Sequence, residues 1–462
     1  MDVPSRRLRL TEEQRIRLQC HLFSGDGRES AALALCGTRI GKDNQVYCVH
    51  EITEVPVKAC SLRSRSAVRW DVQTLVPVLE KALKRGMWVM KIHSHPEGYE
   101  RFSPQDDETD SQLGKAIEAV LERSPSLISA FMSPSGKLWA RVVDTEAGFQ
   151  AVDRVMAVGD EVSFTKAESR LNEDEVNLRT RQVFGDGTVN LLKSMTIGVV
   201  GCSGTGSWVI EALTRLGVGQ LVLIDPDHIE RKNLNRIVNS KAVDAENKRA
   251  KVNVLADAVR AIGLGTIVET FQCDLAKTEV INSLAGCDFL FGCMDSADGR
   301  DLLNRIAAYY LVPYIDIGVR LDADGRGGIE QICCALHYLI PGGSSLLSRG
   351  VITPEQVQAQ ALRRTNPEQY AALKREGYIK GVAVDRPAVI SVNGFVATHA
   401  VNEMLARVHP YRRDPNQGFR YQVFSLCDGS WLQLPDGPPC KLLYRCVGRG
   451  DVNPLLGNPA LL

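Results

Sequence analysis

The order of hydrophobic and polar positions indicates alternating strands and helices in the first part of the chain. Short apolar runs predict strands at 30–37, 45–55, 87–92, 127–132 and 137–143. Amphipathic spacing predicts one helix over 72–86, which ends at Gly86, and a second over 106–124. We therefore expect a mixed α/β domain over residues 1–150.

A second pattern begins at Met195. An apolar run is followed by a glycine-rich turn, an amphipathic helix over 207–217 and a second apolar run ending near Asp225. This order is typical of the opening βαβ unit of a doubly wound parallel sheet. Further strands at 267–274 and 287–295 and a late helix over 391–407 extend the pattern. We expect a Rossmann-like α/β domain over 176–410.

Two segments lack such patterns. Residues 151–175 are polar and lose clear periodicity, which predicts a linker, and residues 411–462 form a tail rich in Pro, Gly and Arg with no assigned role. A length of 462 residues is too great for one typical core, so more than one domain is expected.

Composition narrows the partners. The 55 basic and 55 acidic residues balance, so no basic field indicates nucleic acid or an anionic membrane. No apolar run approaches the roughly 18 residues of a membrane span, and the residues after Met1 lack a signal-peptide core. The 13 cysteines are odd in number and include no CxxC pair, which suits a reducing compartment. We expect a cytoplasmic protein.

The first candidate site follows the strand at 87–92. His93 and His95 stand two apart, so in a strand both side chains face one metal ion. Asp106 can complete a three-ligand set, which leaves a fourth position for water, as in catalytic zinc sites. Glu29 is the candidate acid/base, and Ser103 the candidate hydrogen-bond donor to an oxyanion.

Other readings of these residues stay open. Ser103 also suits the N-cap of a helix with proline in its first turn. The two histidines alone would fit a surface pair near a strand end. Asp107 competes with Asp106 as the third ligand, although the spacing favours Asp106.

The whole string is more specific than its parts. His93 to Asp106 matches H-x-H-x(7)-S-x-x-D without a gap, and Glu29 precedes a small-residue strand. Residues 12–150 thus resemble a JAB/MPN (JAMM) metallopeptidase domain. The resemblance implies zinc on His93, His95 and Asp106, with cleavage of peptide or isopeptide bonds after ubiquitin-like C-termini. No core position is missing, which argues against an inactive relic.

The second candidate site is the glycine-rich turn. Gly201, Gly204 and Gly206 lie between a strand and a helix, where backbone N–H groups hold phosphate. Asp225 ends the next strand and suits a ribose hydroxyl. The turn and Asp225 together fit NAD as well as ATP.

Later residues favour ATP. A group of polar and positive side chains follows Asp225: Asn233, Arg236 and Lys251. A dehydrogenase does not need such a group, but a reaction in which a nucleophile attacks an α-phosphate does. Asp295 follows another strand and is placed to hold Mg²⁺. A Rossmann domain for NAD remains the alternative.

These residues resemble the ThiF/MoeB/HesA family, which shares the fold of the ubiquitin-activating enzymes. The resemblance covers about 176–410, although Ser203 stands where the family has glycine. It implies ribose binding by Asp225 and triphosphate contacts by Asn233, Arg236 and Lys251. The other positions that match the signature are Asp227, Asp295 and Arg300. Arg181 matches an arginine that reaches into the partner subunit's site, so a homodimer is expected.

The two sites have one target in common. We expect a bifunctional enzyme that adenylates the C-terminal carboxylate of a ubiquitin-like protein with ATP and Mg²⁺, and hydrolyses bonds after that C-terminus with zinc. Its partners would include a conjugating enzyme. The alternative is sulphur-carrier activation and release, with a sulphurtransferase as partner. A non-enzymatic scaffold has little support. Between Ala335 and Leu426 there is no cysteine to form a thioester.

Overall fold

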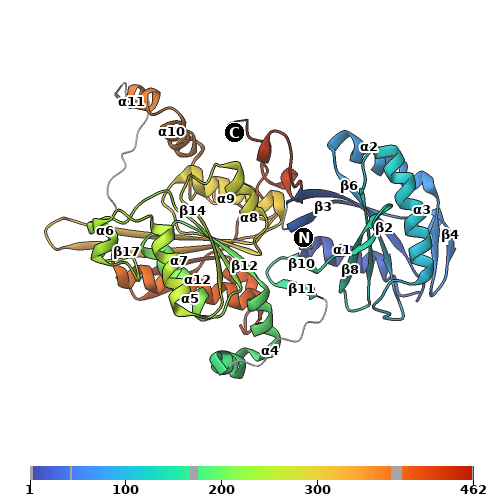
Figure 1. The fold of residues 1–462 in the computed structure, drawn as a ribbon, viewed down its shortest axis with the longest axis horizontal. Coiled ribbons are helices and arrows are strands. Elements are labelled where there is room, and N and C mark those ends of the chain that lie inside the picture. Colours follow the sequence, from blue (N-terminus) through green and yellow to red (C-terminus); the bar gives the residue numbers. More distant parts are fainter. Residues whose placement is uncertain (1–3, 42–43, 167–174, 376–387, 460, 462) are drawn as a thin grey trace. The chain divides into compact units, whose positions relative to one another are not determined.

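The computed structural model describes residues 4–41, 44–166, 175–375, 388–459 and 461. The chain forms two compact units (Figure 1). Unit 1 comprises Met1–Arg170, Tyr309–Leu311 and Cys446–Gly457, and unit 2 comprises Leu171–Ala308, Val312–Arg445 and Asn458–Leu462.

Unit 1 is built on a nine-stranded mixed sheet with the order β11-β10-β1-β3-β2-β6-β7-β8-β9. Its strands are β1 (Ser5–Thr11), β2 (Ala31–Ile40), β3 (Asn44–Glu54), β6 (Trp88–Ser94), β7 (Leu127–Met132), β8 (Leu138–Asp144), β9 (Gly148–Ala151), β10 (Arg154–Val158) and β11 (Val162–Lys166). A separate ribbon pairs β4 (Cys60–Arg63) with β5 (Val68–Trp70). The helices are α1 (Glu12–Leu22), α2 (Val76–Arg85) and α3 (Pro104–Leu121).

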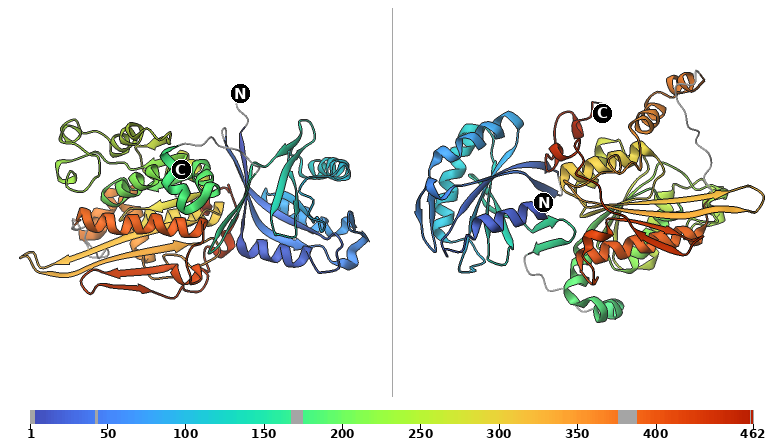
Figure 2. Two further views of the ribbon diagram at one scale, coloured as in Figure 1. Left: turned by 90° about the horizontal axis from the view of Figure 1, so that it is seen from below. Right: turned by 180° about the vertical axis from the view of Figure 1, so that it is seen from behind.

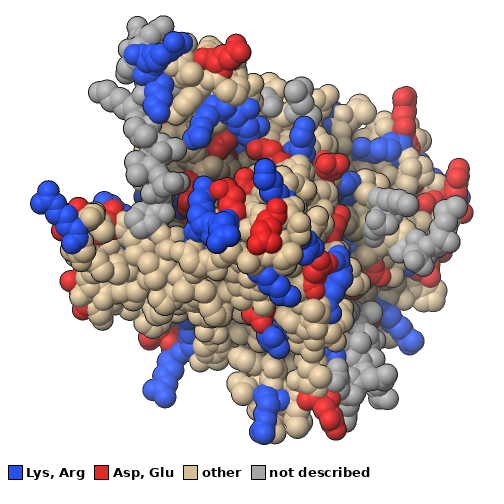
Figure 3. Space-filling model, turned by 60° about the vertical axis from the view of Figure 1, so that its left-hand side comes forward, with Lys and Arg blue, Asp and Glu red and all other residues tan. Residues whose placement is uncertain are grey.

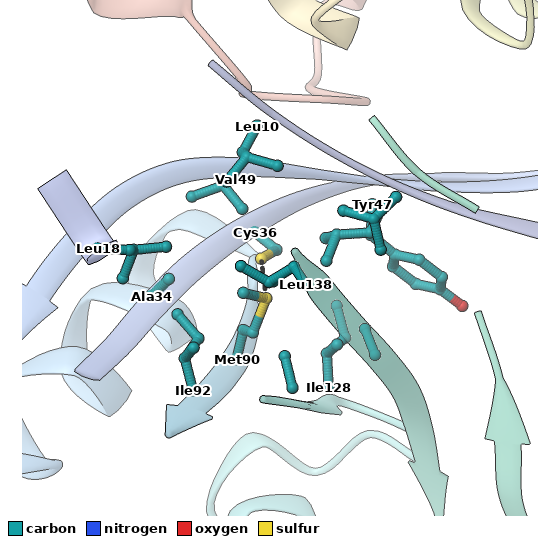
Figure 4. Packing of buried hydrophobic residues seen from close by; sticks show 14 of the residues in the cluster. Leu10, Leu18, Ala34, Cys36, Tyr47, Val49, Met90, Ile92, Ile128 and Leu138 are labelled. Carbon is teal, nitrogen blue, oxygen red and sulfur yellow. Dashed lines mark hydrogen bonds between the residues drawn. The ribbon is translucent and has the colours of Figure 1, made fainter. Parts of the chain in front are cut away.

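Both faces of the central strands of unit 1 are buried. In β2, Ala32, Ala34 and Cys36 pack with α1 on one face, as Figure 4 shows around Cys36 and Met90. The alternate residues Leu33 and Leu35 pack with α2 and α3 on the other face. Successive side chains of a strand point to opposite faces, so a continuous apolar run is what a strand covered on both sides requires.

The segment at 151–175 differs from the linker that the sequence predicts. Two strands form there: β10 pairs with β1 in parallel, and β11 pairs with β10 in antiparallel. All five residues of β10 are buried. The run is only five residues long and is flanked by polar positions, so it gives a weak periodic signal.

Unit 2 is built on an eight-stranded sheet with the order β14-β13-β12-β15-β16-β17-β18-β19. Its strands are β12 (Thr196–Val200), β13 (Gln220–Ile224), β14 (Ile267–Phe271), β15 (Phe289–Gly292), β16 (Tyr314–Ala323), β17 (Ile329–Leu339), β18 (Tyr421–Ser425) and β19 (Ser430–Gln433). Its helices are α4 (Leu178–Ser194), α5 (Gly204–Arg215), α6 (Ala242–Glu246), α7 (Lys251–Ile262), α8 (Thr278–Ala285), α9 (Ala297–Tyr310), α10 (Pro354–Thr365), α11 (Pro367–Arg375) and α12 (Ile390–Val408).

The strands from β14 to β16 are parallel, and those from β17 to β19 add antiparallel pairs. The chain moves outward from β12 to β13 and β14, then returns to place β15 on the other side of β12. Strand order therefore reverses between β12 and β15, which is where doubly wound sheets bind ligands. The helices α5 and α12 pack side by side on this unit (Figure 2). The expected mixed α/β architecture with a Rossmann-like sheet is confirmed.

Residues 411–462, left without a role by the sequence, divide between the two units. β18 and β19 extend the sheet of unit 2, whereas Cys446–Gly457 belongs to unit 1. There, His50 Nδ1 lies 2.6 Å from the Val447 carbonyl oxygen, and the Asp451 N–H donates to the Thr38 carbonyl at 2.8 Å. Backbone contacts thus join this segment to β2 and β3.

The surface agrees with the balanced composition. Basic and acidic side chains are interspersed on the face shown in Figure 3. Among the described helices, none is long and apolar enough to cross a membrane.

Candidate metal centre and nucleotide site

The strand β6 and the helix α3 bring three metal-ligating side chains together. His93 Nε2 lies 2.9 Å from His95 Nε2 and 3.1 Å from Asp106 Oδ1. His95 Nε2 lies 3.8 Å from Asp106 Oδ2. The ligand atoms of these three residues all lie within 4.8 Å of one another.

Neighbouring groups orient the ring of His95. It stacks on Phe131 with a centroid separation of 4.3 Å and an interplanar angle of 11°. Its Nδ1 lies 2.6 Å from the Tyr99 carbonyl oxygen. A carbonyl can only accept, so Nδ1 carries the hydrogen, and the lone pair of Nε2 is directed at His93 and Asp106.

This arrangement fits a zinc ion. Two nitrogens at the usual zinc distance in a tetrahedral site lie roughly 3.3 Å apart, close to the observed 2.9 Å between the two Nε2 atoms. Burial lowers the pKa of His93, which favours the neutral, metal-ligating form. The three residues would hold the ion and leave a coordination position open.

The start of α3 positions Asp106. Ser103 caps the helix: its Oγ accepts from the Asp106 N–H at 3.2 Å, and its own N–H and Oγ donate to Asp106 Oδ2 at 2.8 and 2.7 Å. Ser103 is thus the N-cap of α3. Its hydrogen bond to an oxyanion stays a prediction. Asp107, the rival ligand, pairs instead with Arg141 at 2.5 Å.

Glu29 lies near the candidate metal ligand Asp106. Ala31 pairs with His93 across β2 and β6, and Glu29 precedes Ala31 by two residues. Burial, with the nearby Asp106 carboxylate, raises the pKa of Glu29 to about 8. A cation bound at the histidines would favour the ionised form of this carboxyl group. Its acid/base role stays a prediction.

In unit 2, two glycines of the glycine-rich turn occupy positions with no room for a side chain. Gly201 has φ +94°, and a Cβ there would lie 2.5 Å from the Cys293 carbonyl oxygen. A Cβ on Gly206 would lie 1.8 Å from the Gly201 carbonyl oxygen. Among the described side chains, none caps the N-terminus of α5. Its first N–H groups therefore remain available for phosphate.

An ionic group borders this turn. Asp225 is buried, and its Oδ2 accepts from the Cys202 N–H at 2.8 Å. Lys251 Nζ lies 2.7 Å from Asp227 Oδ2 and 3.6 Å from Asp225 Oδ1. Burial raises the pKa of Asp225. Lys251, at the start of α7, therefore supplies a buried positive charge beside the carboxyl end of β13.

The other predicted nucleotide contacts flank the same edge. The Cδ of Arg236 lies 3.5 Å from the position of a Cβ on Gly204. Asn233 is buried, and its Oδ1 accepts from the Glu230 N–H at 3.0 Å. Asp295 is exposed in the loop after β15, two residues beyond the Cys293 that contacts the turn. Arg236 and the segment that carries Asp295 thus lie beside the glycine-rich turn.

Two predicted site arginines have partners within the chain. Arg300 Nε donates to Asp316 Oδ1 at 2.9 Å, its Nη2 pairs with Asp316 Oδ2, and Tyr314 OH donates to Asp316 Oδ1 at 2.6 Å. Asp316 is fully buried. Arg181 Nε lies 3.2 Å from Asp186 Oδ1. Nucleotide contact by Arg300 and a subunit-crossing role for Arg181 stay predictions.

The Arg300–Asp316 pair gives a stability prediction. We expect Asp316→Ala to lower the free energy of unfolding by about 3–5 kcal/mol, because it leaves the Arg300 side chain, which is only 13% exposed, without its counter-charge. Denaturant titration measures this. The control is Asp257→Ala, which breaks exposed pairs with Arg249 and Arg260 and should change stability by less than about 1 kcal/mol. Equal effects would contradict the prediction.

The sequence did not indicate one residue of this site. Asn393 of α12 is buried, and its Nδ2 lies 2.2 Å from where a Cβ on Gly204 would be. Gly204 is therefore required by α12 as well as by the turn itself. A glycine next to Asn393 within a helix could have indicated a functional position. The indication is weak, because Gly394 is also explained by its close packing on Trp208.

The fold and site define a Rossmann-like α/β protein with a phosphate-binding turn at its switch point. Residues 176–436 match the ThiF family, and the chain belongs to that family.

Several curated proteins are similar to parts of this chain. SAMP-activating enzyme E1 of Haloferax volcanii is 32% identical over 134 residues, covering 29% of this chain and 48% of that protein. Ubiquitin-like modifier-activating enzyme 5 of Drosophila persimilis is 22% identical over 274 residues, covering 55% and 65%. The tRNA threonylcarbamoyladenosine dehydratase of Escherichia coli is 26% identical over 198 residues, covering 43% and 63%. The chain thus spans 48% to 65% of the lengths of these relatives.

A looser likeness exists among solved structures. E. coli MccB with ATP is 16% identical, with a TM-score of 0.44, over 58% of this chain and 74% of that one.

Proposed function

We propose that unit 2 is an ATP-dependent adenylyltransferase that activates the C-terminal carboxylate of a ubiquitin-like or sulphur-carrier protein. One observation carries the proposal: Lys251, paired with Asp225 and Asp227, lies at the carboxyl edge of a sheet that also bears the glycine-rich turn. Membership of the ThiF family and relatives named as activating enzymes support it.

Each residue has a role in this proposal. The N–H groups at the start of α5 bind phosphate, and Asp225 accepts from a ribose hydroxyl. Arg236 and Lys251 offset the negative charge that builds up on the α-phosphate when a carboxylate attacks it and pyrophosphate leaves. Asp295 would hold Mg²⁺, which supplies further charge neutralisation.

Pyrophosphate exchange into ATP tests the proposal. Exchange should depend on a ubiquitin-like protein with a free C-terminal glycine carboxylate, and the same protein with an amidated C-terminus should give none. Exchange stimulated by tRNA would favour a dehydratase-type substrate instead. Binding of NADH without ATP binding would support a dehydrogenase and overturn the proposal.

The reaction is expected to stop at the adenylate. A thioester needs a nearby thiolate. Residues 341–385 contain neither cysteine nor histidine, and burial raises the pKa of the two thiols beside the glycine-rich turn, Cys202 and Cys293. Cys334 is buried in β17, and burial raises its pKa to about 11. Incubation of enzyme, ATP and modifier should give no reductant-sensitive adduct on a gel. An adduct that disappears in Cys333→Ala or Cys334→Ala would contradict this prediction.

A second function is proposed for unit 1. The convergence of His93, His95 and Asp106, with the JAB/MPN resemblance, supports a zinc peptidase that cleaves after the C-terminus of the same modifier. When bound, zinc lowers the pKa of a water molecule. Glu29 would accept a proton and pass it to the leaving amine. Phe131 and the Tyr99 carbonyl hold His95 in its orientation.

A further inference from the structure

Next to the candidate metal centre, β6 and α3 make a second contact between a strand side chain and a helix carboxylate. His93 lies 3.1 Å from Asp106, and two strand residues earlier Lys91 Nζ lies 2.5 Å from Asp110 Oδ1. The two elements run in opposite directions, so one step back along the strand matches one turn forward along the helix. Two strand residues advance about 6.6 Å, and four helix residues advance about 6 Å. The second contact is therefore in register with the first.

The second contact belongs to an ionic cluster in which Arg141 pairs with both Asp110 and Asp107. Asp110 is fully buried, and Lys91 and Arg141 are each less than a tenth exposed. The Asp110 carboxylate binds both cations, since Arg141 Nη2 lies 2.7 Å from its Oδ2. The Arg141 guanidinium also lies 3.8 Å from the ring centroids of Phe102 and Phe149. Asp110 is thus the anion that neutralises Lys91.

Lys91 faces the same side as the metal ligands. In a strand, Lys91 and His93 project from one face, so the buried Lys91 side chain lies on the side of the metal ligands. A positive charge in this buried region weakens the binding of a metal cation by electrostatic repulsion unless an anion neutralises it. The proposed zinc site does not require a positive charge at position 91. Whether zinc binds therefore depends on the anion that neutralises Lys91.

We propose that Asp110 is a positioning residue of the metal centre, which holds Lys91 in an ion pair and so permits a dication to bind at His93, His95 and Asp106. This rests on the zinc site of the proposed function. Removing the anion and removing the cation should have opposite effects on zinc affinity. A pair that only braced α3 against β6 would weaken zinc binding when either member was lost.

Zinc affinity of the full chain, measured by chelator competition, tests this. Asp110→Asn should weaken zinc binding by about 10–100-fold. Lys91→Met should bind zinc as tightly as the wild type or more tightly, because Asp110 keeps Arg141 as a partner. The Lys91→Met/Asp110→Asn double variant should bind at least about tenfold more tightly than Asp110→Asn alone, because coupled residues are not additive.

Controls separate this inference from the proposed function. Glu12→Gln, which breaks the Glu12–Arg15 pair on α1, should leave zinc affinity unchanged. If the wild type binds no zinc, the proposed peptidase site itself fails. If the wild type binds zinc and Asp110→Asn binds it equally, or if Lys91→Met weakens binding as much as Asp110→Asn does, the inference is overturned. Should Asp110→Asn not fold, the sign of the Lys91→Met effect alone decides the question.

Discussion

Asp295→Ala should lower ATP–pyrophosphate exchange by about 100-fold or more and leave cleavage by unit 1 unchanged. Asp295 is exposed in the loop after β15, two residues from the Cys293 carbonyl that contacts the glycine-rich turn. We propose that this carboxylate holds the Mg²⁺ of a bound nucleotide. Loss of a group that stabilises charge in the transition state costs about this much.

Exchange should be measured over a range of Mg²⁺ concentrations. The variant should recover part of its activity at high Mg²⁺, because the nucleotide phosphates still bind the ion weakly. Asp257→Ala, which removes an exposed carboxylate from the same unit, serves as the charge control and should exchange normally. Wild-type exchange in Asp295→Ala at low Mg²⁺ would remove Asp295 from the site.

Glu29→Gln should lower cleavage of a ubiquitin-like fusion by about 10²–10⁴-fold and keep the zinc. Glutamine occupies the same space but cannot carry a proton from water to the leaving amine. His95→Ala should lose both zinc and cleavage, because it removes one of three ligands that lie within 4.8 Å of one another.

Metal analysis of the purified variants, together with cleavage assays, distinguishes the two roles. Zinc content equal to the wild type in His95→Ala would contradict the ligand assignment. Loss of zinc in Glu29→Gln would make Glu29 a ligand or a structural support. His21→Ala provides a matched control, because His21 hydrogen-bonds the Ala31 carbonyl from α1 and should affect neither measurement.

The placement of the candidate residues in both sites was largely predictable from the sequence, because local periodicity determines where these side chains point. The apolar run of β6 predicts that His93 and His95 share a face, and the helix start at Ser103 brings Asp106 toward them. In unit 2, the strand, turn and helix order likewise predicts the phosphate-binding turn. Long, strongly periodic segments are the most predictable parts of a chain.

What the sequence missed depends on partners distant along the chain. The short β10 is a strand because β1 and β11 pair with it, and β18 is a strand because β17 does. The sequence did not indicate that Asp316 on the next strand pairs with Arg300, whose nucleotide contact stays a prediction. The sequence does contain an indication of the Lys91–Asp110 pair, because a lysine inside a buried apolar run needs a nearby anion.

Unit 1 is discontinuous along the chain, because Cys446–Gly457 returns to it after most of unit 2. A Cβ on Gly37 would lie 2.2 Å from the Arg449 carbonyl carbon, so the returning segment packs directly on β2. During synthesis, unit 1 stays incomplete until Cys446–Gly457 has emerged, although its first 166 residues contain every strand of its sheet. A fragment ending at residue 150 would also lack β10 and expose an edge of β1.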